Sequence, residues 1–330
     1  MMIKLLMISA FLLAGCVRTP LDKKLVSCGL DKKFSDDRAL FGRVYLQKTV
    51  LKGGASGAQL YKLSDGAKNY VLRDISHRSE EDRIREISAQ KNASENGYGP
   101  ELYAYDVSQG KLIMSFLQAC AQPNDRHQEM IKLVEALKKM HQGSAFFKCT
   151  SLVQQIKTFN SQVSILPKGI DRKKIAHLLD EISSLDVYPK CLTHRDLNPN
   201  NIFFTDQGVK FIDFENAALD DPFVDVATVI IFYQYAGAME NEFLKLYLGK
   251  EASQQDKDHL ELMKKAVSLF YGLILLLLSK VGDSLQEMNI PESSLATALK
   301  KMFEGRLSLE NQRDLLELAL AFLHEALNTN

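Results

Sequence analysis

The stretch His194-Arg195-Asp196-Leu197-Asn198-Pro199-Asn200-Asn201 decides the fold of this chain, together with Asp213-Phe214-Glu215, which begins twelve residues after Asn201. Residues 201–204 and 209–212 have the composition of two short strands, and residues 205–208 that of the turn between them. A hairpin with arms of equal length brings Asp213 back to the end at which Asn201 begins. Asn201 and Asp213 are therefore expected to present oxygen ligands to one small volume, as a hard cation such as Mg²⁺ requires.

The same stretch supplies the groups that phosphoryl transfer from a nucleotide requires. Asp196 is expected to be the catalytic residue, because its carboxylate can accept the proton of a substrate hydroxyl. Asn201 and Asp213 are expected to hold Mg²⁺ against the phosphates, so ATP and Mg²⁺ are the expected cofactors. An ordinary surface hairpin with scattered polar residues is the alternative. The pattern H-x-D-x-x-x-x-N followed by an Asp at the end of a strand favours the catalytic interpretation.

The stretch resembles the catalytic core of the aminoglycoside phosphotransferase and choline-ethanolamine kinase family, the small-molecule branch of the protein-kinase-like fold. Asn198 stands where protein kinases usually carry Lys, and Glu215 replaces the Gly of their Asp-Phe-Gly. Residues 216–227 are also similar to the family, in which an Asp-Pro turn opens a helix. The resemblance implies that Asp225, early in that helix, and His194 give structural support to the catalytic loop and the metal-binding segment. Arg195, by contrast, looks like the protein-kinase form.

The expected elements before this core match the small lobe of that fold. They are strands at 44–50, 59–63, 69–75, 102–106 and 111–117, and a helix from Ser79 to about Glu95. The resemblance therefore implies an α+β, two-lobed protein-kinase-like fold, with a small five-stranded antiparallel β lobe carrying one helix and a large, mainly helical lobe. The small nucleotide-binding lobe is expected at 39–117, and the large catalytic and acceptor-binding lobe at 118–330.

A glycine-rich turn between the first two strands is the expected phosphate cover. Its glycines allow backbone amides to approach phosphate oxygens, and a plain tight turn is the alternative. The residues expected to contact the nucleotide there are Gly53, Gly54, Ser56 and Gly57.

Four further residues are expected at the nucleotide because the family places such groups there. The resemblance implies that Arg73 binds the α/β-phosphates through its guanidinium, and that Glu86 of the following helix orients it. Glu80 and Glu81 are the alternatives to Glu86 as the residue that orients Arg73. Met114 and Phe116, at the end of the last strand of the small lobe, are expected to border the adenine, although a buried edge strand needs the same residues.

The expected partner is a small-molecule hydroxyl acceptor, and its charge is expected to be cationic. Glu215 and Asp220 could attract an amine, and Tyr233 and Tyr235, with Phe232, Phe270 and Tyr271, could form an aromatic cage around it. A stripe of aromatic residues on a helix is more often part of a core. The chain contains no Trp. The Asp-Phe-Glu and Asp-Asp-Pro segments favour choline or ethanolamine, whereas an aminoglycoside, thiamine or a sugar stays open.

The N-terminus resembles the signal peptide of a bacterial lipoprotein. Lys4 precedes an apolar run over 5–14, and Gly15-Cys16 follows. Residues 1–16 are therefore expected to be the signal and 17–38 a linker, with a lipidated Cys16 as the membrane attachment. A misassigned start or an apolar helix packed on the protein is the alternative. ATP dependence favours the cytoplasm instead, and a catalytically inactive, membrane-anchored binding protein with the same fold also stays open.

The composition excludes several other classes of protein. The 41 basic and 41 acidic residues give zero net charge, so nucleic acid is not an expected partner. No C-x-x-C pair occurs among the five cysteines, which argues against a zinc or thioredoxin-like site. The apolar run at 266–278 is too short to span a bilayer, so it is expected to be a buried core helix.

Overall fold

The computed structural model describes residues 47–51, 57–64, 66–143, 150–183, 188–280 and 290–327. Its strands are β1 (Gln47–Val50), β2 (Gln59–Ser64), β3 (Asn69–Asp74), β4 (Leu102–Asp106), β5 (Lys111–Ser115), β6 (Cys191–Thr193), β7 (Ile202–Thr205), β8 (Gly208–Phe211) and β9 (Ala218–Asp220). Its helices are α1 (Glu80–Glu95), α2 (Arg126–His141), α3 (Leu152–Gln162), α4 (Arg172–Ser183), α5 (Phe223–Tyr233), α6 (Ala238–Leu248), α7 (Gln254–Ser279), α8 (Leu295–Phe303) and α9 (Gln312–Leu327). The predicted signal and linker, and Gly53, Gly54 and Ser56, lie outside the described residues.

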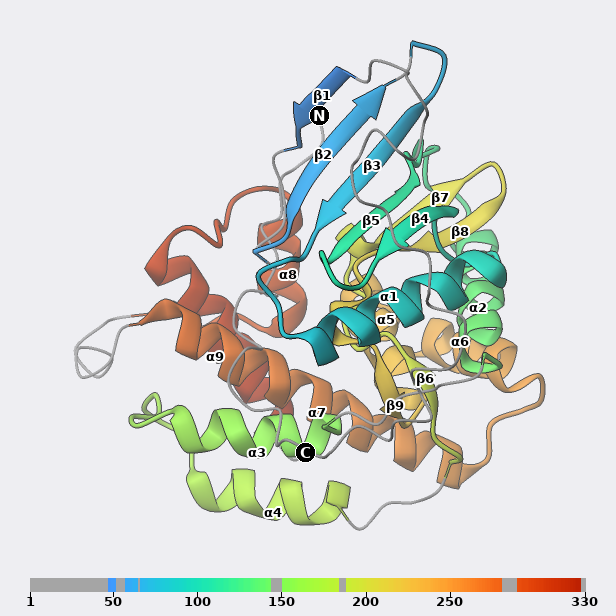
Figure 1. The fold of residues 1–330 in the computed structure, drawn as a ribbon. Helices are drawn as coiled ribbons and strands as arrows, with labels where there is room; N and C mark the ends of the chain where they lie inside the picture. Colours follow the sequence, from blue (N-terminus) through green and yellow to red (C-terminus); the bar gives the residue numbers. More distant parts are fainter. Residues whose placement is uncertain are drawn as a thin grey trace.

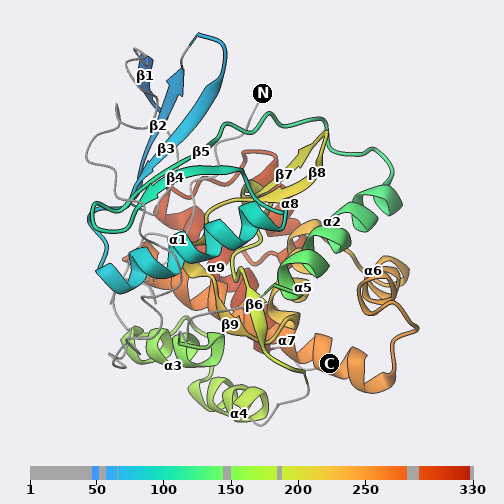
Figure 2. The ribbon, with the colours of Figure 1, turned by 45° about the vertical axis from the view of Figure 1, so that its right-hand side comes forward.

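The small lobe is an antiparallel sheet with the strand order β1-β2-β3-β5-β4. Its two faces carry separate apolar clusters, and Ile87 of α1 joins the cluster that also contains Ile75 and Leu112. Because side chains alternate along a strand, Arg73 lies on this α1 side of β3 while Leu72 belongs to the opposite cluster. The helical lobe lies below the sheet, and α1 runs between the two (Figures 1 and 2). The predicted five-stranded lobe with one helix is confirmed.

Helix α1 begins and ends where the sequence predicts. The Ser79 hydroxyl accepts a hydrogen bond from the backbone N–H of Asp82, which satisfies one of the free donors of the first turn. Glu80, Glu81 and Asp82 place negative charge beside the positive end of the helix dipole. Its buried face includes a carboxylate, that of Glu86, which is only 2% exposed.

Helix α7 forms the centre of the large lobe. It starts at a capping box made by Ser253 and Asp256, and α3, α4, α5 and α9 pack around it. Among the described residues, α7 is the one helix that is long and apolar enough to cross a membrane. However, 72% of its most apolar stretch is buried inside the protein. The prediction of a buried core helix over 266–278 therefore holds for the second half of α7.

The hairpin β7–β8 joins the two lobes. Its strands pair from Ile202 opposite Phe211 to Thr205 opposite Gly208, so Asp206-Gln207 forms the turn that the sequence predicts. The Phe211 N–H donates to the Tyr98 carbonyl, and the Phe204 carbonyl accepts from Cys120, which follows β5. The hairpin that carries Asn201 and Asp213 at its open end is therefore anchored to the segments that enter and leave β4–β5.

Gly272 allows α9 to approach α7 closely. A Cβ atom at this position would lie 2.7 Å from Leu323 Cγ and 3.1 Å from the Leu323 backbone nitrogen. We expect Gly272→Ala to lower the free energy of unfolding by about 1–3 kcal/mol, because the methyl group overpacks this contact. Urea unfolding followed by far-UV circular dichroism measures the change.

The double variant identifies the contact responsible. Leu323→Ala alone is expected to cost about 2–5 kcal/mol, because it leaves a cavity. In that background Gly272→Ala should cost less than it does in the wild type, since the nearest clashing atoms are gone. Strictly additive losses would show that the strain at Gly272 arises elsewhere.

Candidate active site

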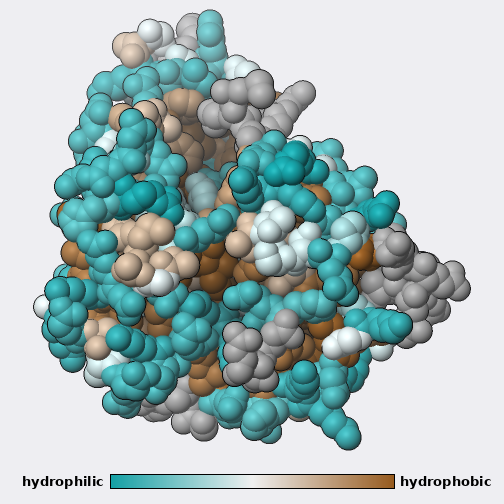
Figure 3. All heavy atoms as spheres, turned by 180° about the vertical axis from the view of Figure 1, so that it is seen from behind, coloured by the Kyte–Doolittle hydropathy of each residue, from teal (hydrophilic) through white to brown (hydrophobic). Residues whose placement is uncertain are grey.

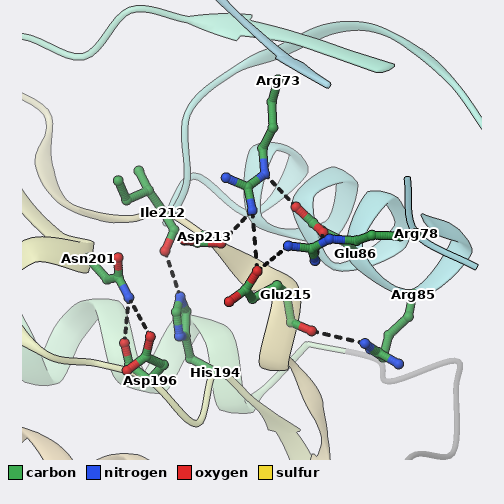
Figure 4. Close-up of polar contacts among 10 residues, drawn as sticks. All are labelled: Arg73, Arg78, Arg85, Glu86, His194, Asp196, Asn201, Ile212, Asp213 and Glu215. Atoms are coloured by element: carbon green, nitrogen blue, oxygen red, sulfur yellow. Dashed lines mark hydrogen bonds and ion pairs between the residues drawn. The ribbon is translucent and has the colours of Figure 1, made fainter. Parts of the chain in front are cut away.

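The catalytic loop after β6 is fixed by the carboxylate of Asp225 in α5. Asp225 Oδ2 accepts from the His194 backbone N–H and Oδ1 from the Arg195 backbone N–H, each at 2.7 Å. The His194 ring donates from Nε2 to the Ile212 carbonyl at 2.8 Å (Figure 4). Burial lowers the pKa of His194, so the ring is a neutral donor that ties the loop to the end of β8. Both residues thus make contacts of the supporting kind that the resemblance implies.

Arg195 holds the turn of the loop from the other side. It has a positive φ of 64°, which is uncommon for a residue with a side chain. Its guanidinium donates to the Thr150 carbonyl at 2.5 Å and to Asp220 Oδ2 at 3.3 Å. Asp220 also accepts the backbone N–H of Leu152, at the start of α3. Its carboxylate is thus engaged by the protein itself, and a role for Asp220 in acceptor binding stays a prediction.

Asp196 lies buried with three side-chain donors around its carboxylate. Oδ1 accepts from Asn198 Nδ2 at 3.0 Å and from the Tyr271 hydroxyl at 2.8 Å. Oδ2 accepts from Asn201 Nδ2 at 3.0 Å. Burial raises the pKa of Asp196 to about 7, although these three hydrogen bonds oppose the shift. A carboxylate with a pKa near neutral pH is suited to accept a proton in catalysis.

Asn201 and Asp213 come together as the sequence predicts. The Ile212 N–H donates to the Asn201 carbonyl at 3.0 Å, so Asp213 directly follows a residue paired with Asn201. Asn201 Nδ2 donates to both the backbone carbonyl and the carboxylate of Asp196, and the amide oxygen consequently points away from Asp196 (Figure 4). An amide oxygen and a carboxylate at the open end of one hairpin are hard donors that fit Mg²⁺.

Two arginines of the small lobe meet the acidic residues of the large lobe at this point. Arg73 Nε lies 2.6 Å from Glu86 Oε1, the partner predicted for it, and Nη2 lies 2.6 Å from Asp213 Oδ1. Arg78 forms ion pairs with Glu86 Oε2, at 2.5 Å, and with Glu215 Oε2. Figure 4 shows the resulting chain of alternating charges. Although burial opposes the charge, Asp213 and Glu86 raise the pKa of Arg73, so its guanidinium stays ionised.

Glu215 faces the small lobe in this arrangement. Its backbone carbonyl accepts from Arg85 Nη2 at 3.0 Å, and its carboxylate pairs with Arg78. Burial and the nearby Asp213 raise the pKa of Glu215, while Arg78 and Arg73 oppose the rise. Glu215 therefore connects the lobes, and its predicted contact with an amine acceptor receives no support from this placement. No sequence signal identified Arg78, because a lone Arg between a strand and a helix belongs to no motif.

The predicted nucleotide residues have varied surroundings. Met114 is buried in the small-lobe cluster with Ala58 and Ile75, whereas Phe116 is partly exposed, with Lys62 Nζ 5.1 Å from its ring centroid. Gly57 has a positive φ of 70°, which suits the end of a tight turn. Seen from behind, the surface is hollowed beneath the small lobe, and apolar residues line the hollow (Figure 3). Contact of these residues with a nucleotide stays a prediction.

The aromatic pair predicted to hold the acceptor faces a cation of the protein itself. Tyr233 and Tyr235 are buried with their rings stacked at 5.7 Å, and the guanidinium of Arg126 lies 4.7 Å from the Tyr235 ring centroid. The Tyr235 hydroxyl donates to Glu129 Oε1 at 2.6 Å. These contacts join the segment that follows α5 to α2, so they favour the core interpretation, and acceptor binding by the pair stays a prediction.

Known proteins resemble this chain in sequence and in fold. A model of the family described as the phosphotransferase enzyme family matches residues 49–258. The protein LicA homolog of Mycoplasma capricolum subsp. capricolum is 26% identical over 144 residues, which are 43% of this chain. The chain spans 57% of the length of that curated relative.

Two solved structures illustrate the likeness in fold. The choline/ethanolamine kinase family protein from Mesorhizobium loti has a TM-score of 0.61 at 17% identity, covering 86% of this chain and 94% of that one. The spectinomycin phosphotransferase APH(9)-Ia, solved with ADP and spectinomycin, has a TM-score of 0.51 at 15% identity, covering 84% and 94%. The two-lobed protein-kinase-like fold is thereby confirmed.

The raised pKa of Asp196 predicts a pH-dependent stability. Below pH 4 the carboxyl is protonated in both the folded and the unfolded chain. Between pH 4 and pH 7 the unfolded chain ionises while the folded protein keeps its proton, so the folded state loses about 1.4 kcal/mol per pH unit. Asp196→Asn removes this titration. We therefore expect the variant to gain stability relative to the wild type as the pH rises from 4 to 7.

Urea unfolding of both proteins across this pH range measures the difference. Asp258→Asn, at an exposed position of α7, controls for the change of residue type. A difference between Asp196→Asn and the wild type that stays constant with pH would contradict the prediction.

Proposed function

The chain belongs to the phosphotransferase enzyme family, and we propose that it transfers the γ-phosphoryl group of ATP to a hydroxyl of a small amino alcohol such as choline or ethanolamine. The observation that carries this proposal is the convergence of Asp196, Asn201 and Asp213 at the open end of the β7–β8 hairpin. Arg73 reaches the same point from the small lobe. A base, two oxygen donors and a fixed cation are the parts that such a transfer uses.

Asp196 is assigned to the acceptor. Its carboxylate orients the substrate hydroxyl and takes the proton as the oxygen attacks the γ-phosphorus, while the bond from that phosphorus to the leaving ADP oxygen breaks. Asp196 is only 5% exposed, so its burial excludes bulk water from the carboxylate. The attacking hydroxyl thereby competes with little water.

Asn201 and Asp213 are assigned to Mg²⁺, and Arg73 to the phosphates. The ion, when bound with ATP, supplies positive charge that offsets the charge developing on the phosphate oxygens. Asp213 Oδ1 already lies 2.6 Å from Arg73, so this carboxylate can orient the guanidinium as well as a metal ion. ADP in the structure of the spectinomycin phosphotransferase supports nucleotide use in this fold.

The proposal that the acceptor is an amino alcohol is supported by two sequence segments and by similar proteins. Asp213-Phe214-Glu215 and Asp220-Asp221-Pro222 resemble choline and ethanolamine kinases. The Mesorhizobium loti protein belongs to the choline/ethanolamine kinase family, and the curated relative is a LicA homolog. Fold alone does not select the acceptor, so an aminoglycoside, thiamine or a sugar is the alternative.

We expect the full-length protein to form ADP from ATP in a reaction that depends on choline or ethanolamine. A coupled ADP assay with choline, ethanolamine, thiamine, sugars and aminoglycosides, each tested separately, measures this. Chelation with EDTA should abolish turnover and excess Mg²⁺ restore it, because the two oxygen donors and the phosphates share the ion. Turnover with an aminoglycoside alone would overturn the amino alcohol assignment. No turnover with any acceptor would favour an inactive binding protein.

Asp196→Asn tests the base within the same assay. The variant keeps the shape of the side chain and loses its basicity, so we expect turnover to fall at least about 100-fold. Affinity for ATP, measured by calorimetry, should stay within about threefold. Asp206→Asn, in the exposed turn of the β7–β8 hairpin, is the matched control and should keep full turnover. Full activity of Asp196→Asn would contradict the assigned role.

The location of the protein is a separate proposal with two outcomes. If residues 1–16 form a lipoprotein signal, the mature protein in its native host begins at an acylated Cys16 and is attached to the membrane. If they do not, the intact N-terminus is retained, as the use of cytoplasmic ATP favours. The mass of the N-terminal peptide from the native host distinguishes the two.

A further inference from the structure

Tyr271 lies in the second half of α7, beyond residues 49–258 that the family model matches. Its hydroxyl donates to Asp196 Oδ1 at 2.8 Å, and the tyrosine is only 1% exposed. We propose that Tyr271 is a positioning residue, which holds the Asp196 carboxylate so that Oδ2 is the oxygen that receives the proton of the acceptor. This inference rests on the phosphotransferase function proposed above.

The hydrogen bonds of Asp196 identify the reactive oxygen. Each oxygen of a carboxylate can accept about two hydrogen bonds. Oδ1 accepts two, from Asn198 and Tyr271, and is therefore saturated. Oδ2 accepts one, from Asn201, and keeps one acceptor position. A substrate hydroxyl can thus be received at Oδ2 without displacing a hydrogen bond of the protein.

The origin of the three donors gives Tyr271 a distinct task. Asn198 and Asn201 belong to the same loop as Asp196, so they move with it. Among the described residues, Tyr271 is the hydrogen-bond donor to this carboxylate that comes from a core helix. Its hydrogen bond fixes the rotation of the carboxylate relative to the body of the large lobe rather than only within the loop.

The aromatic ring of Tyr271 is held on several sides. It meets Phe232 of α5 edge to face, with ring centroids 5.1 Å apart, and it stacks on Phe322 of α9 at 5.4 Å. Gly272, the next residue, allows α9 to pack closely against α7. A ring packed in this way has little freedom to rotate, so the position of the hydroxyl is determined by the helical core.

Tyr271→Phe in the full-length enzyme tests the inference, because it removes the hydroxyl and keeps the packed ring. We expect kcat to fall roughly 10- to 100-fold, since a hydrogen bond to a charged group is lost at the base. The KM for ATP should change less than about twofold, because no nucleotide contact is altered. A kcat within about twofold of the wild type would overturn the proposal.

Tyr188→Phe is the matched control. The Tyr188 hydroxyl also bonds a carboxylate of α7, that of Asp256, at the opposite end of the helix from Tyr271. We expect this variant to keep the kcat of the wild type. An equal loss of kcat in both variants would show that any tyrosine hydroxyl bonded to a carboxylate stabilises the active lobe, and would overturn a specific role for Tyr271.

A double variant separates positioning from an independent catalytic effect. If Tyr271 acts through Asp196, adding Tyr271→Phe to Asp196→Asn should slow the residual reaction by less than about twofold. A further loss as large as that in the wild-type background would overturn the proposal.

Crystal structures of the wild type and Tyr271→Phe keep the inference testable if the proposed function fails. A wild type that phosphorylates no acceptor contradicts the function and leaves the hydrogen bond to be examined directly. The proposal predicts that the Asp196 carboxylate rotates in the variant. An unchanged orientation of the Asp196 carboxylate would show that Asn198 and Asn201 suffice to orient it, and would overturn the role of Tyr271.

Discussion

The arrangement of the site depends on two hydrogen bonds between the Asp225 carboxylate and the backbone of the catalytic loop. Asp225 is fully buried, and its two oxygens accept the N–H groups of His194 and Arg195. These bonds offset the positive φ of Arg195, which costs about 1–3 kcal/mol, together with the contacts of the Arg195 guanidinium. Because the turn is held there, Asp196 points into the protein, and His194 can reach the Ile212 carbonyl beside Asp213.

Local sequence patterns predicted the helices and strands well. The boundaries of α1 followed from a capping serine and an acidic first turn, and the β7–β8 hairpin from two apolar runs around a short turn. Both features are encoded within about 16 residues of chain, so a single sequence is sufficient to read them.

Contacts between distant segments could not be predicted in the same way. The hydroxyl of Tyr271 meets Asp196 across 75 residues, and Arg78 meets Glu215 across 137. Tyr271 lies in an almost continuous apolar run, where its hydroxyl gives no periodic signal. The partners that the acidic and aromatic residues predicted for the acceptor have in the structure could not be predicted for a related reason. Composition indicates that Glu215 or Tyr235 can attract a cation, but not that Arg78 and Arg126 are the cations beside them.

Buried ion pairs join the two lobes beside the apolar contacts that Ala89, Ala93 and Tyr98 make with the core of the large lobe. Arg73 and Arg78 pair with Glu86 inside the small lobe and with Asp213 and Glu215 across the boundary. Buried ion pairs add little net stability, because removing the charges from water offsets most of their attraction. They do require specific directions, so this cluster sets how the lobes align more than how strongly they adhere.

The packing of α9 against α7 has a consequence for the order in which this enzyme matures on the ribosome. The small lobe and the catalytic loop emerge first and contain the information for their own strands. The tyrosine that orients the base is enclosed only when Phe322 and Leu323, more than a hundred residues downstream of Asp196, have been synthesised and docked. A nascent chain therefore completes its β-rich lobe well before the side chain that holds Asp196 is locked in place.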